Sequence, residues 1–172
     1  MKAYLDTNLI SAIPKKEFPS EILALNQLMD SFDACKLELR TSKVTHTEIE
    51  RYAGMKKGEM MELYHRLEKV PFVEDHELLG FHSQWDRSGG VSSPLVEDDP
   101  FSSALRKMGL DRPDAHHLML AIYAHCDVFL TCDKKTILNR RARIEGRFHI
   151  RLMKPSALVE EFAGSGEGDE TG

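Results

Sequence analysis

The chain has 172 residues, of which 41% are hydrophobic and 30% are charged, and its formal net charge is −5. This composition is typical of a globular protein, and the length fits one domain with its own hydrophobic core. The negative charge argues weakly against broad, nonspecific binding to nucleic acid. No apolar stretch is long enough to cross a bilayer, and the carboxylate of Asp6 comes too early for a signal peptide, so we expect a cytoplasmic protein. The cysteines are expected to be reduced thiols.

The first half of the chain alternates strand and helix signals. Residues 2–5 form a short apolar run, and residues 37–41 alternate apolar and polar side chains, as strands do. Ser20 and Ser42 each stand before apolar residues at helical spacing, so both are expected to cap helices. The predicted elements are a strand over 2–5, a helix from Ser20 to Phe32, a strand over 37–41, a helix from Lys43 to Ala53, a helix over 56–69 and an edge strand over 70–73.

The second half repeats this alternation after an irregular stretch. Residues 75–100 predict an inserted helix and loop, and a loop of that length often serves as a lid or binding segment. Asp111 is expected to cap a strong helix that runs from Arg112 to His125. The remaining predicted elements are a strand over 127–131, a helix near Asp133, a strand over 147–152 and a helix opened by Pro155.

Strands that alternate with helices predict an α/β fold with a mostly parallel sheet. We expect a single domain over residues 1–163. Residues 164–172 are acidic and rich in glycine and have nothing to bury, so we expect them to form a disordered tail. Ligands of parallel sheets bind at the carboxyl ends of the strands, so polar residues at those ends are the first candidates for a site.

Two of the predicted strands end in an aspartate. Asp6 follows the strand over 2–5, and Asp133 follows the strand over 127–131. If these strands are parallel neighbours, both carboxylates lie at the same edge of the sheet. Each aspartate also has an ordinary explanation, because Asp6 can form an Asx turn and Asp133 can cap the next helix.

Two more acids lie on the apolar sides of predicted helices. At 100° per residue, Glu48 is about 40° from Val44 and falls inside the apolar stripe of its helix. Asp114 lies on the buried side of a helix that is almost wholly apolar. Ordinary explanations exist here too, because Asp111 and Asp114 have the spacing of a capping box, and Glu48 can reach water from the edge of its stripe.

Four acids that face one point predict a metal site. They cannot all stay ionised without compensation, and a divalent cation is the usual partner. Mg²⁺ and Mn²⁺ prefer oxygen ligands, and such ions activate water and stabilise charge during phosphodiester hydrolysis. The predicted catalytic metal ligands are Asp6, Glu48, Asp114 and Asp133, and the predicted supporting residues are Asn8 and Thr131.

At these residues the chain resembles the PIN domain, a family of metal-dependent nucleases. The matching stretches are YLDTNLI, SKVTHTEIE, RPDAHHLMLAIYA and FLTCDKKTI, which follow the family's order and span residues 4–139. The resemblance implies a three-layer α/β/α fold and an acidic site that binds Mg²⁺ or Mn²⁺. It gives metal-site roles to the same four acids and supporting roles to Asn8 and Thr131. The implied activity is that of an endoribonuclease, which hydrolyses RNA phosphodiester bonds.

Many small PIN proteins are toxins of the VapC type, and this chain is similar to them. Such toxins cleave structured RNAs such as transfer RNA, form homodimers and are blocked by an antitoxin peptide. The resemblance therefore implies an RNA substrate, an antitoxin partner and a homodimer. The chain differs from a minimal toxin in the length of its 75–100 region and in a heavy basic run over residues 140–154.

Three other features have structural and functional interpretations. His116 and His117 are expected on the flanks or outer face of their helix, about 200° and 300° from Asp114, and no His/Cys spacing of the usual zinc-site kind appears. Cys132 is expected to be structural, because its side chain should point away from those of its strand neighbours. The arginines of the basic run form either a solvated helix face or a contact for RNA phosphates or an acidic partner.

Two other functions fit part of the pattern. A phosphatase similar to the haloacid dehalogenase family would use Asp6 as a nucleophile, but those enzymes need a second aspartate where this chain has Asn8. No glycine-rich phosphate loop follows either. A non-catalytic RNA- or protein-binding module could keep the same fold, although the presence of all four acids argues against it.

Overall fold

In the computed structural model of this protein, residues 1–15, 18–55, 60–73 and 100–165 are described. Five strands form one sheet in the order β3-β2-β1-β4-β5, and each neighbouring pair is parallel. The strands are β1 (Lys2–Leu5), β2 (Glu38–Ser42), β3 (Phe72–Val73), β4 (Val128–Leu130) and β5 (Arg151–Met153). The predicted α/β fold with a parallel sheet is therefore confirmed, and β3 is an edge strand as its preceding proline indicated.

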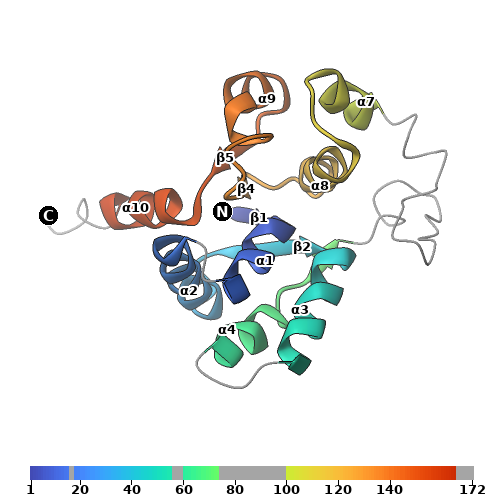
Figure 1. Cartoon of the computed structure of the whole chain (residues 1–172). Helices are drawn as coiled ribbons and strands as arrows, with labels where there is room; N and C mark the ends of the chain where they lie inside the picture. Colours follow the sequence, from blue (N-terminus) through green and yellow to red (C-terminus); the bar gives the residue numbers. More distant parts are fainter. Residues whose placement is uncertain (16–17, 56–59, 74–99, 166–172) are drawn as a thin grey trace, which may run out of the picture.

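Helices cover both faces of the sheet, which gives three layers (Figure 1). One face carries α1 (Thr7–Lys15), α2 (Pro19–Asp33), α3 (Lys43–Met55), α4 (Met60–Leu67) and α10 (Pro155–Ser165). The other face carries α7 (Pro100–Lys107), α8 (Arg112–Tyr123) and α9 (Arg141–Phe148), which follows the short 3-10 helix Leu138–Arg140. Within the described ranges no helix has both the length and the apolar character needed to cross a membrane.

Alternate residues of the two central strands face two separate cores. Leu5 and Leu130 belong to the core beneath α1 and α2, whereas Tyr4 and Phe129 belong to the core beneath α8. All four side chains are fully buried, and the rings of Tyr4 and Phe129 stack with their centroids 5.4 Å apart. Successive strand residues point to opposite faces, so a sheet covered on both sides needs apolar residues at every position. The short apolar runs of the sequence are these doubly buried strands.

The two predicted serine caps have different outcomes. The Ser42 hydroxyl accepts a hydrogen bond from the Thr45 backbone N–H at 3.0 Å, which confirms the predicted cap of α3. Ser20 is not a cap, because α2 already begins at Pro19, after Phe18 in a left-handed conformation. Proline suits the first helical position, since the N–H of that position has no partner within the helix.

Two segments after central strands differ from the prediction. Helix α1 was not predicted, because the polar residues after β1 resemble a turn. Instead, the Asp6 backbone carbonyl accepts the Leu9 N–H at 3.1 Å, and the helix starts directly after the strand. The helix predicted to begin near Asp133 starts later, because the Asp133 side chain binds the backbone N–H groups of Lys135 and Thr136 in a turn over residues 134–137. The 3-10 helix Leu138–Arg140 and α9 follow this turn.

Other boundaries move by a few residues. Asp111 caps α8 as predicted, and its side chain accepts the Asp114 N–H at 3.0 Å. The last strand begins at Arg151 rather than at residue 147, because α9 continues to Phe148. Helix α10 extends through Ser165, into the predicted tail. The predictions for residues 56–59, 74–99 and 166–172 lie outside the described residues, so of the predicted insert only the start of α7 is seen.

Candidate functional site

The candidate site lies where the chain leaves the two central strands. β1 and β4 are neighbours, with Leu5 paired to Leu130, and the strand order reverses between them. The chain after β1 crosses one face of the sheet, whereas the chain after β4 crosses the other (Figure 1). In such sheets the crevice at the carboxyl ends of these two strands is the usual place for a ligand. Asp6 and Thr131 enter this crevice side by side, since the Asp6 N–H donates to the Leu130 carbonyl at 3.0 Å.

The Thr131 hydroxyl orients the Asp6 carboxylate. It accepts hydrogen bonds from the Asn8 side-chain amide at 2.7 Å and from the Asp133 backbone N–H at 3.0 Å. Both partners are pure donors in these bonds, so the hydroxyl proton points to its remaining partner, Asp6 Oδ2, at 2.7 Å. The Asn8 carbonyl oxygen in turn accepts the Cys132 N–H at 3.1 Å. Thr131 therefore contacts the Asp6 carboxylate directly, whereas Asn8 contacts Thr131 and Cys132 and not Asp6 itself.

Asp6 is the most perturbed acid of the site. Its side chain is buried, with a relative exposure of 3%. Burial raises its pKa from 3.8 to about 7, and the negative charges of Asp114 and Asp133 add to this, while hydrogen bonds from Thr131 and the Thr7 backbone oppose it. An acid in this condition takes up a proton or a compensating cation near neutral pH.

The backbone and the side chain of Asp114 interact with different partners. Its N–H donates to the Asp111 cap, so the capping explanation holds for the backbone of this first turn of α8. Burial raises the pKa of its half-buried carboxyl, and the charges of Asp111 and Asp133 add to this. A hydrogen bond with Thr136 and the charge of Arg140 act in the opposite direction. The side chain therefore belongs to the same electrostatic cluster as Asp6.

Asp133 has the capping role that the sequence left open. Its Oδ1 accepts the backbone N–H groups of Lys135 at 2.7 Å and Thr136 at 2.9 Å, and its Oδ2 accepts the Thr136 hydroxyl. Burial alone would raise the pKa of Asp133, but these hydrogen bonds outweigh it, and the pKa lies below its ordinary value. Asp133 is thus a fixed negative charge that also acts on Asp6 and Asp114.

Thr136 is a site residue that the sequence-based prediction missed. Its hydroxyl binds Asp133 Oδ2 and also hydrogen-bonds with the Asp114 carboxylate. A hydroxyl carries one proton, so it can donate to only one of the two acids at a time. The signal available in the sequence was the Asp133-x-x-Thr136 spacing of a side-chain turn, which does not reveal the tertiary partner.

Glu48 approaches the site from a different helix. It lies on α3, one turn after Thr45, whose hydroxyl hydrogen-bonds with that of Thr7 directly after Asp6. The Glu48 side chain is half-buried, and its Oε2 is enclosed by protein. The structure therefore joins Asp6, Asp114 and Asp133 electrostatically and holds Glu48 on the neighbouring helix.

The expectation for the two histidines of α8 is wrong. His116 and His117 are buried, with relative exposures of 4% and 7%, rather than lying on an outer face. Helix α8 packs against both the sheet and α7, so its buried surface is wider than one stripe. His117 hydrogen-bonds with Tyr4 through Nδ1 and with Thr7 through Nε2. Its polar partners, not an apolar stripe, explain its burial.

Cys132 has the structural role that was predicted for it. It is buried in the core beneath α1 and α2, together with Leu9 and Leu25. Burial raises the pKa of its thiol to about 11. A thiol of this kind stays protonated at neutral pH and is a poor nucleophile and a poor metal ligand.

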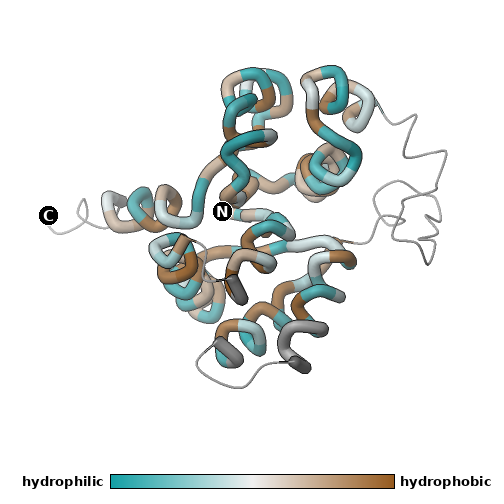
Figure 2. Tube along the Cα trace, viewed as in Figure 1, coloured by the Kyte–Doolittle hydropathy of each residue, from teal (hydrophilic) through white to brown (hydrophobic). Residues whose placement is uncertain are grey.

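The basic run over residues 140–154 does not form one surface. Arg140 points inward, where its guanidinium donates to the carbonyls of Met108 at 2.9 Å and Thr136 at 2.6 Å. At the other end of the run, Arg151 pairs with Glu161 and Lys154 pairs with Glu21. The exposed basic residues of α9 are Arg141, Arg143 and Arg147, and Figure 2 shows this helix as largely hydrophilic.

The donor set of the site fits a hard divalent cation. All of its side chains offer oxygen, and the pKa values of Asp6 and Asp114 are raised mainly by burial and further by the neighbouring aspartates. In the described part of the chain, however, no three His, Cys, Asp or Glu side chains are arranged so that they could hold a metal ion as they stand. The negative charge of each acid affects the pKa of its neighbours, but the carboxylate oxygens do not surround one common point.

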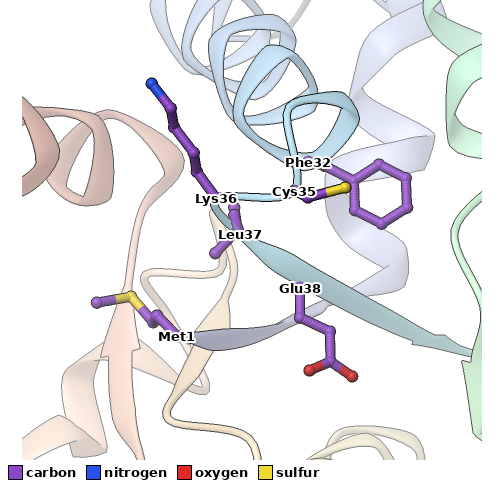
Figure 3. A pocket seen from close by; sticks show the side chains of 6 residues that line it. All are labelled: Met1, Phe32, Cys35, Lys36, Leu37 and Glu38. Carbon is purple, nitrogen blue, oxygen red and sulfur yellow. The ribbon is translucent and has the colours of Figure 1, made fainter.

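A separate hollow lies at the opposite edge of the sheet, around the start of β1 and β2 (Figure 3). Its volume is about 370 Å³. The lining residues are Met1, Phe32, Cys35, Lys36, Leu37 and Glu38. Figure 3 shows Cys35 beside the Phe32 ring and the Lys36 side chain extending away from Glu38. This hollow is not connected with the acids, which lie at the carboxyl ends of the strands.

Comparison of the chain with protein-family models, with curated proteins and with solved structures gave no match.

Proposed function

We propose that this protein is a Mg²⁺- or Mn²⁺-dependent ribonuclease of PIN-domain type that hydrolyses RNA phosphodiester bonds. The observation that carries this proposal is the raised pKa of Asp6, at the carboxyl ends of the strands. Burial and the charges of two neighbouring aspartates raise this pKa to about 7. A buried carboxyl of this kind, placed in the crevice of a parallel sheet, is typical of a functional site.

The proposed ligands are Asp6, Asp114 and Asp133, with Glu48 from the adjacent helix. A bound divalent cation would activate water and stabilise the charge that develops on the phosphoryl oxygens. The chain itself supplies the orientation. Thr131 donates to Asp6 Oδ2 and so fixes the orientation of this carboxylate, and the Asp133 turn keeps a second negative charge nearby.

Exposed cations beside the acids support a polyanionic substrate. Lys134 and Lys135 are exposed and follow Asp133 directly, and the charge of Lys135 helps to lower the pKa of Asp133. Arg143 and Arg147 are also exposed, on α9. Lysine and arginine neutralise backbone phosphates without reading sequence, so such a surface suits RNA held across the acidic site.

The toxin role is part of the same proposal and rests on the resemblance to VapC-type proteins. It includes a cytoplasmic location, an antitoxin partner and a homodimer. Induced expression that arrests growth, with no arrest for Asp6→Asn, is the expected result. Equal growth of cells that express the two forms would contradict the toxin role and leave the nuclease to be judged by cleavage alone.

The alternative is a non-catalytic RNA- or protein-binding module with the same fold. One observation favours it, because the carboxylate oxygens of Asp133 are engaged by its own turn and the acids are not arranged around one point. Binding of RNA that does not need metal, without cleavage, is the result expected for such a module.

An RNA cleavage assay with Mn²⁺ or Mg²⁺ tests the proposal. Asp6→Asn and Asp114→Asn should each reduce cleavage by at least about 100-fold, because each removes a ligand charge worth several kcal/mol of stabilisation. Asp30→Asn is the matched control, since Asp30 is exposed on α2 and pairs with Arg66. Equal cleavage by all four proteins would overturn the metal site. Metal-dependent release of phosphate from small monoesters, without RNA cleavage, would indicate a phosphatase.

A further inference from the structure

A continuous chain of polar side chains lies next to the acids and joins five elements of the fold, β1, α1, β2, α3 and α8. The Tyr4 hydroxyl hydrogen-bonds with His117 Nδ1 at 3.0 Å, and His117 Nε2 hydrogen-bonds with the Thr7 hydroxyl at 3.2 Å. The Thr7 hydroxyl contacts that of Thr45, which contacts that of Ser42 at 2.9 Å. We name these five residues the hydroxyl–histidine chain. Four of them are buried, and Thr7 is half-buried.

If His117 is a neutral imidazole, the protons of this chain can run in one direction from end to end. A neutral imidazole has one donor and one acceptor nitrogen, so the two bonds of His117 run in the same direction. If Tyr4 donates to Nδ1, then Nε2–H donates to Thr7, and the hydroxyl of Thr7 is free to donate to Thr45. The opposite tautomer allows the reverse order throughout. Hydrogen bonds that polarise one another in this way act as a unit, so the loss of one member weakens the others.

Each helix-borne acid lies one turn from a member of the chain. Asp114 is three residues before His117 on α8, and Glu48 is three residues after Thr45 on α3. Residues three apart on a helix lie on the same face. Asp6 directly precedes Thr7 at the junction of β1 and α1. The hydroxyl–histidine chain therefore joins the three elements that carry these acids, through residues that lie one helical turn or one residue away from each acid.

We propose that the hydroxyl–histidine chain is a positioning device that holds α1, α3 and α8 in one arrangement and so sets the spacing of Asp6, Glu48 and Asp114. His117 is its centre, because it is the member that bridges α8 to β1 and to α1. The consequence for metal affinity rests on the proposed function, whereas the mechanical link between the three elements does not.

Specific geometry, rather than stability, explains why this layer is polar. Buried hydroxyls and imidazoles gain little over apolar side chains of the same shape, and they are costly when one partner is removed. A fully hydrogen-bonded network instead admits one arrangement of its members. Elements that carry ligands need that restriction, since residues beyond the ligands orient the ligands themselves.

Two buried tyrosines, one inside the hydroxyl–histidine chain and one outside it, allow a matched test of the proposal. Tyr4 and Tyr64 are both fully buried, and the Tyr64 hydroxyl donates to the Ile10 carbonyl at 3.3 Å, on the other face of the sheet. Tyr4→Phe and Thr45→Val remove a hydroxyl from the chain, and Tyr64→Phe removes one elsewhere. Mn²⁺ affinity is measured by electron paramagnetic resonance titration of the whole protein, and Tm is measured in the presence of a chelator.

The expected result separates positioning from general stability. All three variants should lose about 2–4 °C in Tm, but only Tyr4→Phe and Thr45→Val should weaken Mn²⁺ binding, by about tenfold. Thr45→Ser should restore the affinity, because it keeps the hydroxyl. Unchanged Mn²⁺ affinity in both chain variants, with the same loss of Tm as Tyr64→Phe, would overturn the proposal.

A second measurement keeps this inference distinct from the metal site. In chelator, the Tm losses of Tyr4→Phe and Thr45→Val should not add in the double variant, because the two residues share His117 and Thr7 as intermediates. Additive losses would overturn the mechanical link. If the wild-type protein binds no Mn²⁺, the proposed function fails, and the link is decided by this cycle alone.

Discussion

Thr131 donates its hydroxyl proton to Asp6 Oδ2 across 2.7 Å, and the direction of this bond is fixed by two other donors that occupy the hydroxyl oxygen. Because Oδ2 must accept, a proton on Asp6 has to sit on Oδ1. The neutral and the charged forms of the acid therefore differ at one oxygen only. This relationship connects the stability of the fold with the chemistry of the site.

Replacing Thr131 tests how much its hydroxyl contributes to the free energy of unfolding. Thr131→Val should lower the free energy of unfolding by about 2 kcal/mol, because the Asn8 amide and the Asp133 N–H lose their acceptor in a buried place. Thr131→Ser keeps the hydroxyl and should lose less. Urea denaturation measures both, and equal stability of the valine and serine variants would contradict the assigned bonds.

The stability of the metal-free protein should depend on the protonation of Asp6. Its pKa is about 7 in the folded protein and 3.8 for an ordinary aspartate, so between these values the folded chain holds a proton that the unfolded chain has lost. The contribution of Asp6 is then complete below pH 3.8 and is lost as pH rises to about 7.

Asp6→Asn removes this titration. In chelator, the variant should gain stability relative to the wild type as pH rises from about 4 to about 7, by at most about 4 kcal/mol, and the difference should be constant above that. Urea denaturation at several pH values measures the difference. Parallel pH profiles for the two proteins would contradict the raised pKa.

Thr136 should control the acidity of two carboxyls at once. Thr136→Val removes the hydroxyl that binds Asp133 and Asp114, so the pKa values of both carboxyls should rise. Carboxyl carbon NMR titration measures each pKa. Thr47→Val is the control, because the exposed Thr47 hydroxyl donates to the Lys43 carbonyl within α3. A variant with unchanged pKa values at both aspartates would show that the hydroxyl does not bridge them.

Two glycines should respond in opposite directions to the same substitution. Gly109 has φ +91°, and a Cβ there would lie 3.0 Å from the Arg140 guanidinium. Gly109→Ala should therefore lower the free energy of unfolding by about 1 kcal/mol or more. Gly146 lies within α9, and a Cβ there would meet nothing within 4 Å, so Gly146→Ala should raise it by about 0.5–1 kcal/mol. Thermal or urea denaturation measures both, and destabilisation by both substitutions would contradict the open surface at α9.

The sequence was informative where a local pattern and its tertiary setting agree. Short apolar runs before Asp6 and Asp133 predicted buried parallel strands, and adjacent parallel strands bring their ends together. The supporting positions of Asn8 and Thr131 followed from the same reasoning. Helix α1 was missed because polar residues after a strand are typical of turns, and the pattern does not show that a helix starts without a loop.

The remaining site residues depend on contacts that no local pattern contains. His117 was placed on an outer face because a helical wheel assumes one buried stripe, whereas α8 is packed by the sheet and by α7. The nearly continuous apolar composition of α8 was the signal for this wider burial. Thr136 meets Asp114 through a tertiary contact, next to the Arg140 guanidinium, which binds the carbonyls of both Met108 and Thr136.

The position of β1 has a practical consequence for all of these measurements. Met1 is half exposed at the amino end of the strand, and the four residues of β1 separate it from Asp6 by roughly 13 Å of extended chain. An affinity tag joined ahead of Met1 would therefore leave the molecule on the side of the sheet away from the acids. Such a tag leaves the carboxyl ends of the strands open, but a histidine-rich tag should still be removed before any Mn²⁺ titration, because its imidazoles bind the metal in solution.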